Sequence, residues 1–204
     1  MAPISYWQEC KRKLFHLSSI WMAFAMHFME RSSSIPLFAA LTLIVVMLES
    51  ARHRHPVLMK SFNFLFGGML REHKRNHTFS GAVYVLLAAA LSVILFPKSV
   101  AVTAFTIMII SDTFSALVGR RWGKHSMPGG KSVEGTAAFI VTGIVVVFAC
   151  SYIYVGSSTF LLAGIAGVIG GAVIELFSKQ LGLDDNLTIT LAAGCIMYGI
   201  LYIV

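Results

Sequence analysis

Residues 111–135, SDTFSALVGRRWGKHSMPGGKSVEG, end one long apolar run and begin the next. The segment places a carboxylate, Asp112, inside the first apolar run and then puts several basic residues on a loop that contains Gly and Pro. A carboxylate and a group of cations at the ends of hydrophobic helices are what binding of a metal-complexed polyphosphate at a membrane surface requires. The segment therefore predicts both membrane helices and the position of a site.

The composition of the whole chain indicates an integral membrane protein. Of its 204 residues, 57% are hydrophobic and only 12% are charged, and the mean hydropathy is +0.79. A helix needs roughly 20 apolar residues to cross a bilayer. We expect an all-α, polytopic membrane helix bundle that forms a single domain over residues 1–204. Its seven predicted spans are residues 14–29, 35–49, 79–96, 99–118, 133–155, 158–177 and 187–204.

The Lys and Arg residues predict the orientation of the chain. Fourteen of the 16 lie before residue 14 or in residues 50–78, 119–132 and 178–186, against Arg31 and Lys98 on the other connections. The positive-inside rule then places the N-terminus and the three large loops in the cytoplasm and the C-terminus on the opposite side. The membrane is the plasma membrane in a prokaryote and an internal one, such as the endoplasmic reticulum, otherwise.

The basic loops also account for the net charge of +7, because topology and anionic headgroups explain them without a nucleic-acid partner. Within residues 50–78 apolar and basic residues alternate, which predicts an amphipathic helix lying on the cytoplasmic leaflet.

Six of the nine acidic residues lie within or against the apolar runs, namely Glu49, Asp112, Glu134, Glu175, Asp184 and Asp185. Ionisable groups there indicate function by default, and a buried structural ion pair is the alternative. Asp112 has hydroxyl residues around it, among them Ser111, which suits a ligand of Mg²⁺ or a contact to a nucleotide. Its structural alternative is an ion pair with Arg120 or Arg121. The remaining acids, Glu9, Glu30 and Glu72, are expected to be solvated or paired surface charges.

Lys131 opens the fifth predicted span directly after Pro128-Gly129-Gly130. Backbone N–H groups on a Gly-rich turn at a helix start bind anions, and Lys131 adds a charge that reaches phosphate. Alternatively, Ser132 is a plain N-cap and Glu134 only favours the helix N-terminus. The Walker A pattern is absent, so a soluble P-loop kinase is not predicted.

A third polar group, Glu175 with Asp184, Asp185 and Asn186, follows the sixth predicted span. By topology it emerges on the same side as Asp112, so two or three carboxylates would share one or two Mg²⁺ ions. Helix capping is an equally open role for Asp184 and Asp185.

Five motifs together resemble the CTP-dependent lipid-alcohol kinases, a family that includes dolichol, phytol and farnesol kinases and the CTP-dependent diacylglycerol kinase. They are RKLFH (12–16), FGGMLREHKRNHTFSGAVY (66–84), SDTFSALVGRRWGKH (111–125), GGKSVEGT (129–136) and the E…DDNLTI run (175–189). The resemblance covers nearly the whole chain and assigns no role to Arg12 and His16.

The resemblance implies a cytidine nucleotide site formed by Asp112, Gly119, Arg120, Gly123, Lys124, Lys131, Ser132, Glu134 and Gly135, to which Ser111 adds a polar lining. It also implies that Glu175 and the turn at residues 184–186 complete the metal and catalytic centre. The predicted catalytic residues are Asp112, Lys131, Glu134, Asp184 and Asp185, and the predicted ligands of Mg²⁺ are Asp112, Glu175, Asp184 and Asp185.

The expected reaction is transfer of the γ-phosphoryl group of CTP to the hydroxyl of a polyprenol, dolichol, phytol or diacylglycerol. Lys131, Arg120 and Lys124 would stabilise the transferring group, and Asp184 or Asp185 would accept the hydroxyl proton. Phosphatidate cytidylyltransferase, whose central block is similar, is the alternative, although its C-terminal block is missing here. A small transporter is a further alternative, disfavoured because the acids gather near one face. The expected partners are CTP, the lipid substrate and membrane lipids. The glycines of residues 158–177 are expected to pack against another helix, either within one subunit or between the subunits of a homodimer.

Overall fold

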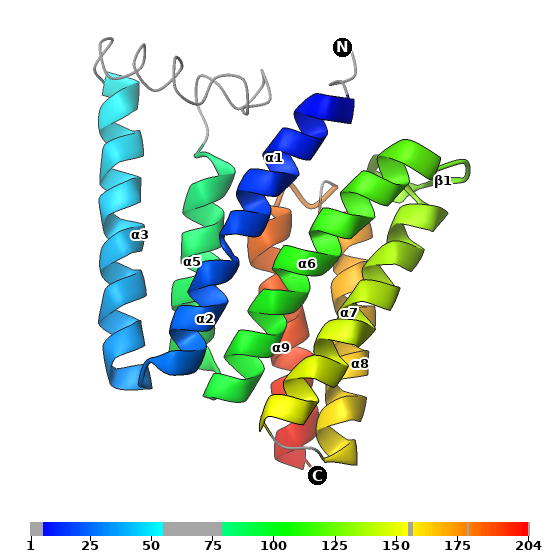
Figure 1. The fold of residues 1–204 in the computed structure, drawn as a ribbon. Coiled ribbons are helices and arrows are strands. Elements are labelled where there is room, and N and C mark those ends of the chain that lie inside the picture. Colours follow the sequence, from blue (N-terminus) through cyan, green and yellow to red (C-terminus); the bar gives the residue numbers. More distant parts are fainter. Residues whose placement is uncertain (1–5, 55–78, 155–156, 179, 204) are drawn as a thin grey trace.

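Long apolar segments fold into helices that lie side by side, and the chain is an all-α membrane helix bundle, as predicted (Figure 1). The computed structural model describes residues 6–54, 79–154, 157–178 and 180–203. Its helices are α1 (Tyr6–Ser18), α2 (Ile20–Phe28), α3 (Arg31–Arg54), α5 (Gly81–Leu95), α6 (Lys98–Trp122), α7 (Val133–Tyr154), α8 (Ser158–Phe177) and α9 (Asp185–Ile203). The amphipathic helix predicted within residues 50–78 lies largely outside the described residues.

Between α6 and α7 the chain forms a small antiparallel hairpin of β1 (Ser126–Met127) and β2 (Lys131–Ser132), joined by a turn at Pro128–Gly130. The sequence predicted only a loop here. Figure 1 shows the start of α1, the end of α3, the start of α5, this hairpin and the turn between α8 and α9 at one end of the bundle, which we call the hairpin end. The C-terminus lies at the opposite end. The connections that are rich in Lys and Arg thus leave the bundle at one end, which is the arrangement that the charge pattern predicts.

Within the described residues, four helices are long and apolar enough to cross a bilayer: α3 over Arg31–Ala51, α6, α7 and α8. The helix α5 is apolar but shorter. The predicted first span is two helices, because the α-helical pattern breaks at Ser19, whose N–H bonds to the carbonyl of His16 (3.0 Å). Within the described residues, the other six predicted spans are helical apart from their ends.

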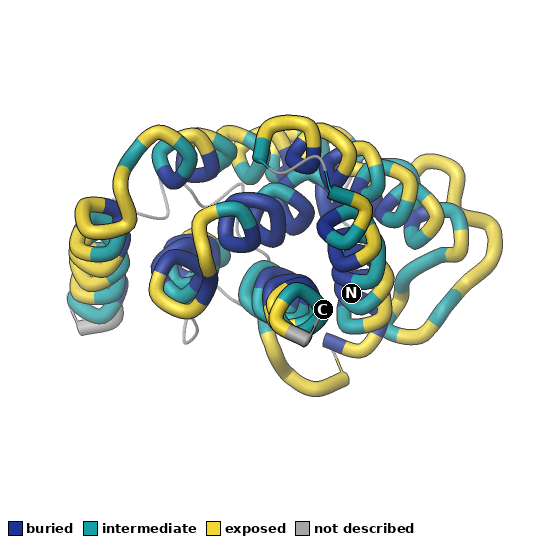
Figure 2. The backbone as a smooth tube through the Cα atoms, turned by 90° about the horizontal axis from the view of Figure 1, so that it is seen from below, coloured by how far each residue is buried: buried dark blue, intermediate teal, exposed yellow. Residues whose placement is uncertain are grey.

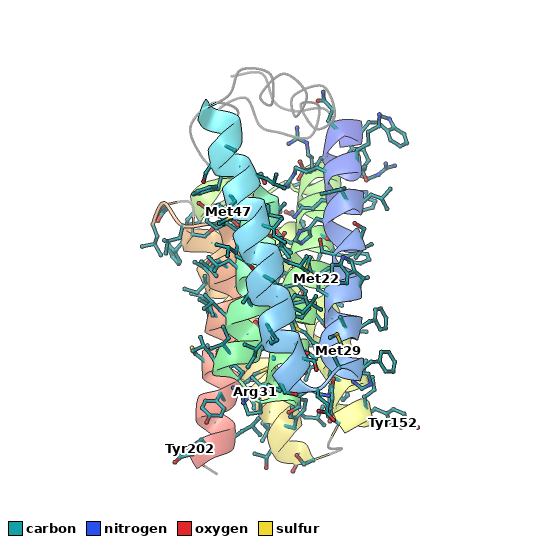
Figure 3. The ribbon with its side chains drawn as sticks, turned by 90° about the vertical axis from the view of Figure 1, so that its left-hand side faces the viewer. Met22, Met29, Arg31, Met47, Tyr152 and Tyr202 are labelled. Carbon is teal, nitrogen blue, oxygen red and sulfur yellow. The ribbon has the colours of Figure 1, made fainter. Side chains whose placement is uncertain are left out.

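The outer surface of the bundle is apolar. Figure 2 shows exposed positions on the outward faces of the helices, and on α7 these include Val141, Val145 and Phe148. Exposed Tyr152 and Tyr202 lie on different sides of the bundle, both at the end opposite the hairpin (Figure 3). Aromatic side chains with a polar tip favour the level of the lipid headgroups, so these residues suit a membrane boundary.

The helix α6 is the centre of the fold and packs against α1, α2, α5, α7 and α9. Of its candidate membrane window 72% is buried, compared with 17% for the peripheral α3. Because α6 carries Asp112, the predicted site lies inside the bundle.

Glycines allow the helices to approach closely. A Cβ on Gly167 would lie 3.1 Å from the carbonyl oxygen of Ala193 on α9, and one on Gly171 would contact Ile189 and Phe139. The glycine face proposed for a homodimer therefore packs within the subunit.

Gly135→Ala is expected to destabilise the protein by about 1–3 kcal/mol, because the added methyl overpacks the contact between α6 and α7. A Cβ there would lie 2.8 Å from the carbonyl oxygen of Ser115 and 3.2 Å from the Cα of Gly119. Gly199→Ala is the matched control, since a Cβ at Gly199 meets no atom within 4 Å. Thermal melting in detergent measures the difference. Equal melting temperatures of the two variants would contradict the close contact.

Candidate active site

Asp112 is buried on α6 and forms an ion pair with Lys13 of α1. The Nζ of Lys13 lies 2.5 Å from Oδ2 of Asp112, and the lysine side chain is only 2% exposed. The structural alternative for Asp112 named Arg120 or Arg121 as its partner, whereas the partner in the structure is Lys13. Arg121 instead lies over the rings of Tyr6 and Trp122. Two elements separated by 99 residues thus meet in a buried charge pair.

Three further side chains of α1 surround this pair. His16 lies one turn after Lys13 on the same helix face, and its Nε2 is 3.6 Å from Oδ2 of Asp112, beyond hydrogen-bond distance. Arg12 donates to both carboxylate oxygens of Glu9, at 2.5 and 3.2 Å. Glu9 is buried, so the expectation of a surface charge is wrong although the expectation of a pair is confirmed.

Lys131 of β2 connects the hairpin to α8 and α9. Its Nζ lies 2.7 Å from Oε1 of Glu175 and 3.5 Å from Oδ2 of Asp185. Burial disfavours the charged form of Lys131 and by itself would lower its pKa. The negative charges of Glu175, Asp112 and Asp185 outweigh this effect of burial, so the pKa of the ammonium is raised above its ordinary value. Lys131 therefore carries its charge throughout the physiological pH range.

The carboxylates around Lys131 have hydroxyl partners. Ser115 of α6 donates to Oε1 of Glu175 (2.8 Å), and Ser178 donates to Oδ1 of Asp185. Glu175 is completely buried, and its Oε2 has no hydrogen-bond partner in the structure.

The hairpin turn places Lys131 beside Glu175. Gly129 and Gly130 both have positive φ, at 73° and 76°. A Cβ on Gly129 would lie 2.5 Å from the carbonyl oxygen of Leu176, the residue after Glu175. Glycine is therefore needed at residue 129 both for the backbone conformation and for contact with the end of α8.

Several predicted nucleotide-binding residues have structural contacts in the hairpin. The N–H of Gly135 donates to Oγ of Ser132 (3.1 Å), so Ser132 is an N-cap of α7. Oε1 of Glu134 lies 2.8 Å from Nδ1 of the His125 ring. A Cβ on Gly123 would lie 2.7 Å from Oγ of Ser132. These contacts maintain the shape of the hairpin that presents Lys131.

The remaining predicted residues are outside the Lys131 contacts described above. Arg120 and Lys124 are exposed at the end of α6 and after it. Asp184 accepts from the backbone N–H and the side-chain amide of Asn186, at 3.1 and 2.8 Å, which is a capping contact at the start of α9. Ser111 is buried, and its Oγ has no hydrogen-bond partner in the structure.

Glu49, one of the six acids singled out by their position, has a structural contact at the start of α5. Its carboxylate accepts from the backbone N–H (2.8 Å) and the hydroxyl of Ser80, the residue before α5. An acid at a helix N-terminus stabilises the free N–H groups there.

The predicted ligands of Mg²⁺ do not form a metal site within the described ranges, where no three His, Cys, Asp or Glu side chains gather to hold an ion. Lys13 and Lys131 instead occupy oxygens of Asp112, Glu175 and Asp185. In this arrangement the residues do not fit a resident ion, and the shared-ion hypothesis stays a prediction.

The residues described above converge into one group that we call the polar cluster. It consists of Glu9, Arg12, Lys13, His16, Asp112, Lys131, Glu175 and Asp185. Arg12 interacts electrostatically with Asp112 and Asp185, and Lys131 with Asp112, so the two ion-pair groups are in range of one another. Sequence reasoning missed Lys13, although its place three residues before His16 on one helix face was a usable signal.

The chain has relatives in bacteria, yeasts and plants. It is 34% identical over 186 residues to an uncharacterised protein of Rickettsia prowazekii, which covers 90% of each chain. It is 26% identical over 161 residues to the CTP-dependent diacylglycerol kinase 1 of Schizosaccharomyces pombe, 72% of each chain. A probable chloroplastic phytol kinase of Triticum aestivum is 24% identical over 204 residues, which cover 94% of this chain and 67% of the relative. No protein-family model and no solved structure matches the chain.

Proposed function

Since this chain belongs to the family of CTP-dependent lipid kinases, we propose that it transfers the γ-phosphoryl group of CTP to the hydroxyl group of a lipid alcohol in the bilayer. The observation that carries the proposal is the convergence of Arg12, Lys13 and Lys131 with buried carboxylates at the hairpin end. Cations held in fixed positions by acids suit a reaction in which negative charge spreads over a phosphoryl group.

In the proposed reaction the lipid oxygen bonds to the γ-phosphorus, and the bond from that phosphorus to the oxygen shared with the β-phosphate breaks. CDP leaves, and the hydroxyl proton passes to a carboxylate or to water. Of the two proton acceptors predicted from the sequence, Asp185 is the one beside Lys131. Lys131 is the residue best placed to stabilise the transferring group, because its position is fixed by Glu175 at 2.7 Å. CTP would enter as its complex with Mg²⁺, which belongs to the substrate.

The membrane placement supports a lipid acceptor. The polar cluster lies at the hairpin end, whereas the outer faces of the helices are apolar. An acceptor whose hydrocarbon tail stays among lipids and helices needs to bring only its hydroxyl to the cluster. The hairpin end would face the cytoplasm, where CTP is available, in agreement with the positive-inside rule.

The test supplies the purified protein with CTP, Mg²⁺ and, separately, dioctanoylglycerol, phytol, farnesol and dolichol, and identifies nucleotide and lipid products by mass spectrometry. The proposal expects CDP and a phosphorylated lipid from at least one alcohol. Release of pyrophosphate with phosphatidate as the substrate would establish a cytidylyltransferase instead. Solute flux in liposomes without any lipid product would establish a transporter.

A further inference from the structure

The Nε2 atom of His16 is a buried polar atom without a hydrogen-bond partner. The His16 side chain is 10% exposed and lies inside the polar cluster, against Asp112 and Lys13. A buried polar atom that lacks a partner costs free energy unless a ligand or water satisfies it. Nε2 of His16 is therefore a candidate contact for a substrate group.

The backbone next to His16 is irregular. The carbonyl of His16 accepts a bond from the N–H of Ser19 (3.0 Å), and the hydroxyl of Ser18 donates to the carbonyl of Phe15 (2.6 Å). These contacts end α1 and separate it from α2 within the predicted first span. Irregular backbone at membrane depth is tolerated where it is buried in protein or lines a polar cavity. The helix break thus lies close in sequence to the unpartnered histidine.

The position of His16 favours the lipid over the nucleotide. His16 lies four residues further along α1 than Arg12, about 6 Å deeper from the hairpin end. Leu14 and Phe15 beside it are exposed on the apolar outer surface. Along α1, His16 is therefore nearer the middle of the bundle, and Arg12 is nearer the hairpin end, where a nucleotide from the cytoplasm would enter.

The chemistry of His16 agrees with this position. A neutral imidazole has one donor and one acceptor nitrogen, and a hydroxyl group both donates and accepts, so it satisfies Nε2 in either tautomer. A phosphate offers only acceptors and would be repelled by the carboxylate of Asp112, 3.6 Å from the same nitrogen. The atom therefore suits an uncharged alcohol better than an anion.

We propose that Nε2 of His16 binds the hydroxyl group of the acceptor alcohol and orients it within the polar cluster. This inference rests on the proposed function for its assignment of the acceptor and deepens it by naming the acceptor site. His16 is a substrate-binding residue in this assignment, and Lys13, whose ammonium contacts Asp112, lies one turn before it on the same helix face.

The test compares His16→Ala, His16→Asn and His16→Gln with the wild-type protein. A glutamine amide reaches the position of Nε2, whereas an asparagine amide reaches only that of Nδ1. Binding of farnesol and of its hydrocarbon analogue without the hydroxyl group is measured in detergent by native mass spectrometry, together with the KM for the alcohol and the Kd for CTP. We expect His16→Ala and His16→Asn to weaken alcohol binding and raise its KM about tenfold, with CTP and hydrocarbon binding unchanged. His16→Gln should recover part of the loss.

His27 provides the matched control, because this histidine lies at the other end of α2 and its Nδ1 contacts the hydroxyl of Tyr154 (2.6 Å). His27→Asn should leave alcohol binding unchanged. The proposal is overturned if His16→Ala binds the alcohol as tightly as the wild type, or if it weakens CTP binding instead. Alcohol binding that depends on His16 without phosphoryl transfer from CTP would refute the proposed function while supporting the acceptor site.

Discussion

Asp112→Asn is expected to abolish phosphoryl transfer and to destabilise the fold by about 3–5 kcal/mol. The variant leaves the ammonium of Lys13 buried without its counter-charge, since only 2% of that side chain is exposed. Removing one member of a buried ion pair costs far more than the pair contributes, because the remaining charge stays desolvated. Release of CDP and the melting temperature in detergent measure the two effects.

The double variant Lys13→Met with Asp112→Leu separates stability from activity. Replacing both charges with apolar side chains of similar size is expected to restore the melting temperature, since apolar replacement of a buried pair is often neutral or stabilising. Activity should stay lost. A stable and fully active Asp112→Asn variant would show that Asp112 is outside the active site.

Lys131→Met is the second variant with a large expected effect, a loss of about 10²–10³ in kcat. It removes the cation nearest to the proposed transferring group and leaves Glu175, which is completely buried, without its ion-pair partner. Steady-state rates with saturating CTP and alcohol measure the loss. Lys98→Met is the control, because Lys98 contacts the carbonyl of His27 at the opposite end of the bundle. The activity of this variant should match that of the wild type.

The pH dependence of this variant follows from the raised pKa of Lys131. A raised pKa means that the stabilisation by the charged amine is fully present below the ordinary value of 10.5 and is lost only as the pH rises through the higher folded value. The ratio of wild-type to Lys131→Met activity should therefore stay constant between about pH 6 and about pH 9. A ratio that falls steeply across this range would place the essential charge on another group.

The apolar runs were sufficient to predict the helices, because crossing a bilayer imposes a length and a composition that are visible in a single sequence. The joint position of Lys131, Glu175 and Asp185 was also predictable, since alternate connections between membrane helices leave at the same end. The helix break at Ser19 was not predictable, because it depends on local hydrogen bonds within a run that is apolar on both sides.

The partner of Asp112 could not be predicted from the sequence alone. Arg120 and Arg121 are near Asp112 in sequence, whereas Lys13 is 99 residues away and reaches it only because α1 packs against α6. Lys13 also belongs to a basic group that the positive-inside rule explains without any contact. Which residues of two helices meet depends on how their side chains pack together. The residue pattern of one segment alone does not predict it.

The polar cluster has a consequence for how a nucleotide is attracted to it. Arg12, Lys13 and Lys131 supply three positive charges, while Glu9, Asp112, Glu175 and Asp185 supply four negative ones. Because the cations of the cluster are already matched by acids, the cluster itself offers a bare triphosphate little net attraction. The triphosphate must bring its own counter-ions, and an excess of uncomplexed CTP should be a poor competitor of the magnesium complex.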